Sequence, residues 1–114
     1  MKRVYIIIPG YNEEKVIVGV IEELLRKGYE NIVVVDDGSK DNTADLAKKA
    51  GATILRHIIN RGQGASLKTG NTYALQEGAD IIVHFDADGQ MQVSDIGKMI
   101  APVLKSEVDV TLGS

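Results

Sequence analysis

The stretch Val4-Tyr5-Ile6-Ile7-Ile8-Pro9-Gly10-Tyr11-Asn12-Glu13-Glu14 sets the pattern on which the fold depends. A short, β-branched apolar run is typical of a buried strand, and Pro9-Gly10 ends it just before a polar, acidic segment. The pattern returns along the chain. It predicts strands at Val4–Ile8, Ile32–Val35, Thr53–Leu55, Ile81–Phe85 and Val108–Leu112.

Segments with helical spacing lie between these runs. One apolar stripe begins at Val16 and ends before Gly28, which is placed to stop the helix, and Asn12 is the expected N-cap. Further helices are predicted for residues 42–50, begun by Ser39 or Asp41 and ended by Gly51; for residues 63–77, ended by Gly78; and from Ser94 to about Ala101, before Pro102.

This alternation predicts the fold class. Strands that alternate with helices imply βαβ crossovers, and strands that are apolar throughout are covered by helices on both faces. We therefore expect an α/β protein, a Rossmann-like three-layer α/β/α sandwich with a mainly parallel sheet. Residues 1–114 are expected to form a single domain, because a chain of this length buries roughly two thirds of its unfolded surface.

Composition excludes several function classes. The chain has 44% hydrophobic residues, 25% charged residues, 4% aromatic residues, no cysteine and a formal net charge of -3. A nucleic-acid-binding module would need a basic surface and stacking rings, so no nucleic-acid partner is expected. No apolar run approaches the roughly 20 residues that a membrane-spanning helix requires. The absence of cysteine excludes thiolate metal sites and fits a reducing compartment, and a cytoplasmic location is expected.

Polar side chains follow each predicted strand. In an open parallel sheet, ligands bind beyond the carboxyl ends of the strands, so these segments should meet at one edge. They are Pro9-Gly10-Tyr11-Asn12-Glu13-Glu14, Asp36-Asp37-Gly38-Ser39, Asn60-Arg61-Gly62-Gln63-Gly64 and Asp86-Ala87-Asp88-Gly89-Gln90.

The last of these segments predicts a metal site. Two carboxylates about 5 Å apart repel by about 3 kcal/mol at an effective dielectric of 20, and a divalent cation would remove that repulsion. Asp86 and Asp88, with the amide oxygen of Gln90, are hard oxygen ligands suited to Mg²⁺ or Mn²⁺. Mg²⁺ is usually shared with substrate phosphates, so a phosphorylated ligand is implied. The alternative is an ordinary acidic loop.

Two other segments have both structural and functional interpretations. Asp36 and Asp37 could accept hydrogen bonds from a base or a ribose, or belong to a turn that leads into a helix cap. The segment around Gly62 resembles a phosphate cradle at a helix start, with Lys68 and Asn71 in reach of a ligand, but a plain turn fits it equally well.

Taken in order, these segments resemble the motifs of family 2 glycosyltransferases, which have the GT-A fold. The closest resemblance is to the dolichyl- or polyprenyl-phosphate sugar transferases, and it runs from Arg3 to Ser114. In that branch a His and prolines usually follow the metal loop, whereas here Met91-Gln92-Val93 follow it. Family catalytic domains are longer, so the match covers their N-terminal, nucleotide-binding half, a truncated GT-A domain.

The resemblance implies a site and a reaction. Pro9, Tyr11 and Glu13 would line a nucleotide pocket, Asp37 would bind the base, and Asp36 would support that loop. A DXD motif, Asp86-Ala87-Asp88, would hold the metal together with Gln90 against the diphosphate of a UDP- or GDP-sugar. The predicted nucleotide-binding residues are therefore Pro9, Tyr11, Glu13, Asp36, Asp37, Gly62, Lys68 and Asp86. The sugar would pass to an acceptor such as a lipid phosphate, at the cytoplasmic membrane face.

Other functions remain open at this point. The chain could instead be a non-catalytic nucleotide-sugar-binding module completed by a partner chain. A sugar-phosphate nucleotidyltransferase would need a glycine-rich, basic loop after its first strand, and a phosphoacceptor domain would need its Asp pair there. A homo-oligomer is expected, because an incomplete GT-A domain leaves a sheet edge and apolar surface uncovered.

Overall fold

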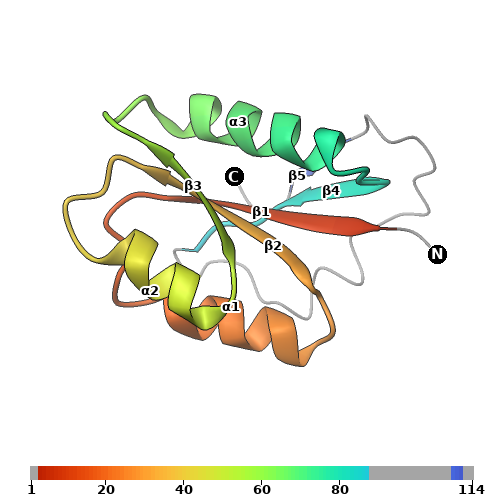
Figure 1. Ribbon diagram of the computed structural model, residues 1–114, viewed down its shortest axis with the longest axis horizontal. Helices are drawn as coiled ribbons and strands as arrows, with labels where there is room; N and C mark the ends of the chain where they lie inside the picture. The colour runs from red at the N-terminus through yellow and green to blue at the C-terminus, as the bar shows by residue number, and fades with distance from the viewer. Residues whose placement is uncertain (1–2, 88–108, 112–114) are drawn as a thin grey trace.

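A computed structural model describes residues 3–87 and 109–111 of the chain (Figure 1). Helices and strands alternate through most of this part. The strands are β1 (Val4–Gly10), β2 (Asn31–Asp37), β3 (Thr53–His57), β4 (Ile81–His84) and β5 (Asp109–Thr111), and the helices are α1 (Ile17–Arg26), α2 (Thr43–Ala50) and α3 (Gln63–Gln76). The predicted alternation is confirmed here, while the helix expected from Ser94 lies outside the described residues.

The strands form one sheet in the order β3-β2-β1-β4-β5, and each pairing between them is parallel. Central β1 sets the register, with Ile7 opposite Val33 of β2 and His84 of β4. From β1 the chain builds outward through β2 to β3, and it then crosses to the other side of β1 to form β4. The order therefore reverses beside β1, and such a switch point is where open α/β sheets bind ligands.

Helices cover both faces of the sheet, with α1 and α2 on one side and α3 on the other (Figure 1). Because successive strand residues point to opposite faces, β1 serves both layers. Ile6 and Ile8 pack with Ile21 of α1, whereas Tyr5 and Ile7 pack with Ala74 of α3. The predicted three-layer α/β fold is confirmed. In the described ranges, no helix has the length and apolar character needed to cross a membrane.

Helix ends agree with the predictions at their carboxyl termini and differ at two amino termini. The residue before α2 is Asn42, rather than the expected Ser39 or Asp41. Gly28, Gly51 and Gly78 follow α1, α2 and α3 with positive φ angles, as expected for glycine stops. The predicted N-cap role of Asn12 is wrong, since α1 begins only at Ile17 and Asn12 has a φ of 54°. Its side chain accepts the Lys40 backbone N–H instead.

Three strands run further than their apolar runs predict, and one stops short. β1 continues through Pro9 and Gly10, β2 through Asp36 and Asp37, and β3 through His57. The reason is that β2 pairs with β1 as far as Asp36, which lies opposite Gly10 and Arg56, and with β3 to its last residue, Asp37, which lies opposite His57. β4 stops at His84, one residue before the predicted end.

Helix α3 packs closely on the sheet because a glycine faces it. Gly70 is buried, and a Cβ atom there would clash with Cγ2 of Ile7 and lie 3.3 Å from Cγ2 of Val35. Both neighbours are β-branched side chains with 0% exposure, so neither can turn away. The absent side chain thus allows α3 to lie directly over β1 and β2, which places its N-terminus at the switch point.

We expect Gly70→Ala to lower the free energy of unfolding by about 1–2 kcal/mol, because overpacking a filled core outweighs the gain in helix propensity. Gly64→Ala is the matched control on the same helix: no atom lies within 4 Å of its Cβ position. It should stabilise the protein by about 0.5–1 kcal/mol. Urea unfolding of both variants measures the difference, and equal stabilities would contradict this account of the packing.

Candidate functional site

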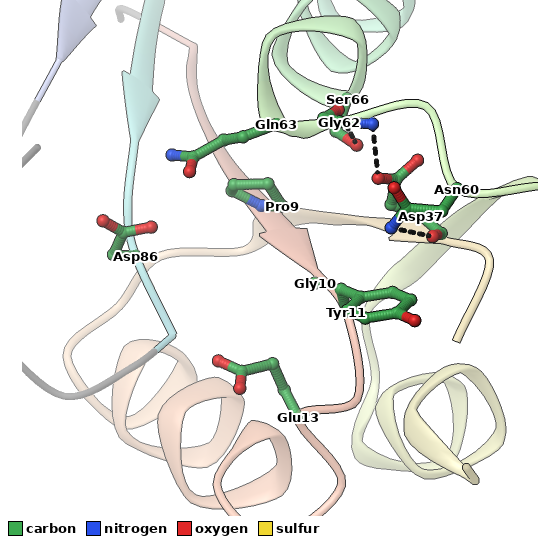
Figure 2. A pocket seen from close by; sticks show the side chains of 10 residues that line it. All are labelled: Pro9, Gly10, Tyr11, Glu13, Asp37, Asn60, Gly62, Gln63, Ser66 and Asp86. Atoms are coloured by element: carbon green, nitrogen blue, oxygen red, sulfur yellow. Dashed lines mark hydrogen bonds between the residues drawn. The ribbon is translucent and has the colours of Figure 1, made fainter. Parts of the chain in front are cut away.

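A cavity of about 290 Å³ opens at the carboxyl edge of the sheet, where the strand order reverses. Four strand-end segments contribute to its wall (Figure 2). Its lining residues are Pro9, Gly10, Tyr11, Glu13, Asp37, Asn60, Gly62, Gln63, Ser66 and Asp86. The polar segments that follow β1, β2, β3 and β4 therefore meet at one edge, as their positions in the sequence indicate.

The cavity begins where β1 and β4 separate. The Phe85 N–H donates to the Ile7 carbonyl at 2.9 Å, and the pairing of these strands extends no further in the described residues. Backbone groups of alternate residues point to the same side of a strand, so position 9 faces β4 as position 7 does. Pro9 has no N–H, and its position on the central strand costs no ladder hydrogen bond there.

One end of the cavity is built around the carboxylate of Asp37, which is 4% exposed. Oδ1 accepts from the Arg61 N–H and from Nδ1 of His57, both at 2.8 Å, and Oδ2 accepts from the Gly62 N–H at 2.8 Å. Asn60 donates from Nδ2 to the Asp37 carbonyl. The carboxylate thereby fastens the β3–α3 connection onto the end of β2.

These contacts determine the charge state of Asp37. Burial raises the pKa of its carboxyl, but hydrogen bonds from His57 and from the Arg61 and Gly62 amides outweigh that effect and hold the pKa below the ordinary value of 3.8. Nδ1 of His57 carries the proton because an ionised carboxylate only accepts. In the neutral ring, Nε2 accepts from Oγ1 of Thr69 on α3 at 2.9 Å.

Asp37 and the groups that donate to its carboxylate, on His57, Arg61 and Gly62, are called the Asp37 clamp. Gly62 turns the chain from this clamp into helix α3. Its φ of 99° belongs to the left-handed region that favours glycine, and it allows the N–H to point at Asp37 as the helix begins. Gln63 and Ser66, in the first turns of α3, then line the cavity. The sequence analysis named Asn60 and Gln63 within the polar segment expected at this edge, without giving either a binding role, and it did not name Ser66.

The β1–α1 connection forms another wall, and it is bound to the start of α2. The Asn12 N–H donates to Oγ of Ser39 and the Glu13 N–H to Oγ1 of Thr43. Asp41 accepts the Glu14 N–H on Oδ2 and the Thr43 N–H on Oδ1. Burial raises the pKa of Asp41, but hydrogen bonds from Thr43 and from the Glu14 amide lower it below its ordinary value.

The other end of the cavity holds carboxylates. Figure 2 shows Asp86 and Glu13 with their carboxylates toward the cavity and the amide of Gln63 beyond Pro9. Oxygen donors of this kind suit Mg²⁺ or Mn²⁺. Residues 3–87 contain no group of three or more His, Asp or Glu side chains placed to hold a metal ion by themselves. Asp88 and Gln90, the other predicted ligands, lie outside the described residues.

The structure brings together six of the eight predicted nucleotide-binding residues at the cavity: Pro9, Tyr11, Glu13, Asp37, Gly62 and Asp86. Asp36 and Lys68 are not in its lining. Asp36 is fully buried, accepts the Ser39 N–H and pairs with Arg56 at 3.3 Å. Lys68 is exposed on α3. A position inside or outside the cavity lining does not test whether a residue binds a nucleotide, so all eight binding roles stay predictions.

Comparison with known proteins identifies the class. Residues 5–114 match the family described as glycosyl transferase family 2, and the chain belongs to that family of enzymes. It is 39% identical to the UDP-N-acetylglucosamine--dolichyl-phosphate N-acetylglucosaminyltransferase of Methanococcus voltae, over 99% of this chain and 52% of that protein. It is 32% identical to the glycosyltransferase AglJ of Haloferax volcanii, over 88% of this chain and 32% of that protein.

A solved structure shows the same fold. The crystal structure of Mycobacterium tuberculosis glucosyl-3-phosphoglycerate synthase superposes with a TM-score of 0.76 at 23% identity, over 90% of this chain and 41% of that one. A second structure of that enzyme contains Mn²⁺, UDP-glucose and phosphoglyceric acid, with a TM-score of 0.73, 23% identity and coverage of 90% and 39%. The GT-A fold is thereby confirmed. The chain spans about half the length, or less, of these relatives.

The Asp37 clamp predicts a measurable pH dependence. Because the folded state holds the pKa of Asp37 below its ordinary value, its stabilisation is present above about pH 4 and is lost as the pH falls through the folded pKa. Asp37→Asn should lower the free energy of unfolding by about 2 kcal/mol at pH 6, since an amide cannot accept all three hydrogen bonds. The difference from wild type should shrink toward pH 2.

Urea unfolding at pH 6, 4 and 2 measures that difference. Asp41 adds a pH dependence of its own to both proteins, so the quantity to follow is the difference in the free energy of unfolding between wild type and Asp37→Asn. The exposed Glu22→Gln on α1 is the charge control and should change stability little at any pH. An Asp37→Asn variant with the same stability deficit at pH 2 as at pH 6 would contradict the ionised clamp.

Proposed function

We propose that residues 1–114 form the donor-binding domain of a metal-dependent glycosyltransferase that transfers a sugar from a nucleoside diphosphate to a lipid phosphate. The observation that carries this proposal is the cavity at the switch point, with Asp37 at one end and Asp86 at the other (Figure 2). A nucleoside diphosphate also has two different ends, a base that donates hydrogen bonds and an anionic diphosphate. The carboxylates of Asp37 and Asp86 lie on either side of β1, so that one would meet the base and the other the diphosphate.

Asp37 suits the recognition of a base. A carboxylate has about four acceptor positions, and three of those on Asp37 are used within the protein. The position that remains on Oδ2 would accept an N–H from uracil or guanine. Tyr11, with 44% exposure in the cavity wall, offers a ring face on which that base could pack.

The opposite end suits the diphosphate. Asp86, with Asp88 and Gln90, would hold Mg²⁺ or Mn²⁺, and the cation would supply charge neutralisation for the departing nucleoside diphosphate. The start of α3 adds backbone N–H groups and the positive end of the helix dipole, where Gln63 and Ser66 line the cavity. Pro9 presents a wall without an N–H donor between the two ends.

The proposed reaction is a single displacement at the anomeric carbon of the donor sugar. An oxygen of the acceptor attacks the anomeric carbon while the bond from that carbon to the diphosphate oxygen breaks, and the electron pair leaves with the nucleoside diphosphate. Attack from the opposite side inverts the configuration of the sugar. A phosphate acceptor is already anionic, so its attack needs no strong general base. The dolichyl-phosphate specificity named for the Methanococcus voltae relative supports a lipid-phosphate acceptor.

Calorimetric titration with UDP, with and without Mn²⁺, tests the donor site. We expect Mn²⁺ to raise the affinity for UDP at least tenfold, and Asp88→Ala to abolish that increase while the metal-independent binding remains. Asp45→Ala, an exposed carboxylate on α2, is the matched control and should behave as wild type. UDP binding that is equal with and without Mn²⁺ would contradict the metal assignment.

A comparison of bases tests Asp37 directly. N3 of cytosine carries no hydrogen, so it cannot donate to the carboxylate. We expect CDP to bind about tenfold more weakly than UDP, and Asp37→Asn to reduce that preference. Equal affinity for CDP and UDP would contradict base recognition by Asp37. A transfer assay with dolichyl phosphate distinguishes an enzyme from a module that binds the donor without turnover.

A further inference from the structure

Two neighbouring isoleucines lie almost fully in solvent beside the cavity. Ile58 is 98% exposed and Ile59 69% exposed, whereas the other exposed large apolar side chains in the described residues reach at most 44%. Both belong to the β3–α3 connection, directly before Asn60 and Gly62 of the cavity wall. The Asp37 clamp and the following helix fix this connection in place, so the exposure is not that of a loose terminus.

The surroundings of this pair are basic. Residues 46–76 contain five cations, Lys48, Lys49, Arg56, Arg61 and Lys68, and no Asp or Glu, although the whole chain has a net charge of -3. Arg56 and Arg61 flank the pair, and both are exposed. Gly38, two residues before the exposed Lys40, lies against the backbone of this connection, since a Cβ there would lie 2.8 Å from the Asn60 nitrogen. Of the nearby acids, Asp36 and Asp37 are buried and bonded inward, and the half-buried Asp41 next to Lys40 accepts the Glu14 and Thr43 N–H groups.

The size and shape of this surface favour a lipid bilayer over a protein partner. Two isoleucine side chains offer on the order of 200 Å² of apolar surface. A stable protein interface needs about 800 Å² from each partner. A bilayer requires no matching surface: aliphatic side chains enter the acyl boundary while flanking cations remain at anionic headgroups.

We propose that Ile58 and Ile59, with Lys40, Arg56 and Arg61, form a docking tip that inserts into the interface of an anionic membrane. The β1–α1, β2–α2 and β3–α3 connections lie at the same end of the sheet (Figure 1). Docking through the tip therefore brings the cavity mouth to the lipid surface. The exposure of the isoleucines and the charge around them support the docking tip independently of the enzyme's reaction. Its use in delivering a lipid-phosphate acceptor rests on the proposed function.

Co-sedimentation of the full chain with vesicles tests the tip. The probes are vesicles of phosphatidylcholine alone and vesicles with an equal share of phosphatidylglycerol. We expect binding to the mixed vesicles only, weakened about tenfold or more by Ile58→Ser with Ile59→Ser. The matched apolar control is Leu25→Ser with Leu75→Ser, which removes side chains of 37% and 42% exposure from the last turns of α1 and α3 and should leave binding unchanged.

Two double substitutions of basic residues test whether vesicle binding depends on the cations of the tip or on the positive charge of the chain in general. Lys40→Gln with Arg61→Gln should weaken binding about tenfold and reduce its salt dependence. Lys48→Gln with Lys49→Gln removes the same charge from the last turn of α2, at the opposite edge of the sheet, and should have little effect. Urea unfolding confirms that each variant is folded, and UDP titration shows whether the donor site is intact.

Three results would overturn the docking tip. The first is no binding of wild type to either vesicle, as expected if a further part of a longer protein covers the isoleucines. The second is equal loss of binding in the tip variants and their controls. The third is a dimer that Ile58→Ser with Ile59→Ser converts to a monomer, without vesicle binding. Intact UDP binding in any of these cases would leave the proposed donor site standing.

Discussion

The buried carboxylate of Asp37 is the interaction on which the rest of the site depends. It lies at the end of β2, and its three hydrogen bonds hold His57 at the end of β3 and the two backbone amides that lead into α3. Burying a charge is costly unless hydrogen bonds replace water, and these donors do so. Through Gly62 the same contacts fix where α3 begins, and through His57 they reach Thr69 within it.

A second set of contacts assembles the opposite wall by the same means. The β1–α1 connection has no regular structure of its own between Gly10 and α1, yet Ser39, Asp41 and Thr43 accept three of its backbone N–H groups. Two side chains from that connection, Asn12 and Glu14, accept backbone N–H groups in return. Side-chain-to-backbone bonds between strand ends therefore position the cavity lining, while the helices supply the core beneath it.

Sequence patterns predicted the elements well because apolar periodicity reports burial. Continuous runs such as Ile6–Ile8 mark strands covered on both faces, and glycine stops mark the ends of α1, α2 and α3. The clustering of strand-end side chains at one edge followed from parallel topology alone. Six of the predicted nucleotide-binding residues do line one cavity, although their chemistry awaits the tests above.

The sequence patterns did not predict which side chains contact each other when the residues lie far apart in the chain. Asn12 has the residue type of a helix cap, but its left-handed backbone directs it to Lys40 instead. The pairing of Asp37 with His57, twenty positions apart, and the cavity positions of Asn60, Gln63 and Ser66 need the three-dimensional arrangement. The apolar pattern alone does not distinguish Asp36 from Asp37; only the family resemblance did, and in the structure Asp37 lines the cavity whereas Asp36 does not.

Pro9 limits what the cavity can accept. Within residues 3–87 and 109–111, β1 has no strand partner on its β4 side beyond Ile7, and an open edge of this kind ordinarily recruits an extended peptide as a new strand. A proline removes the donor that the incoming backbone would need, so β-augmentation is blocked at the position where the sheet is most vulnerable to it. Pro9 therefore disfavours the addition of a further strand at the mouth of the cavity.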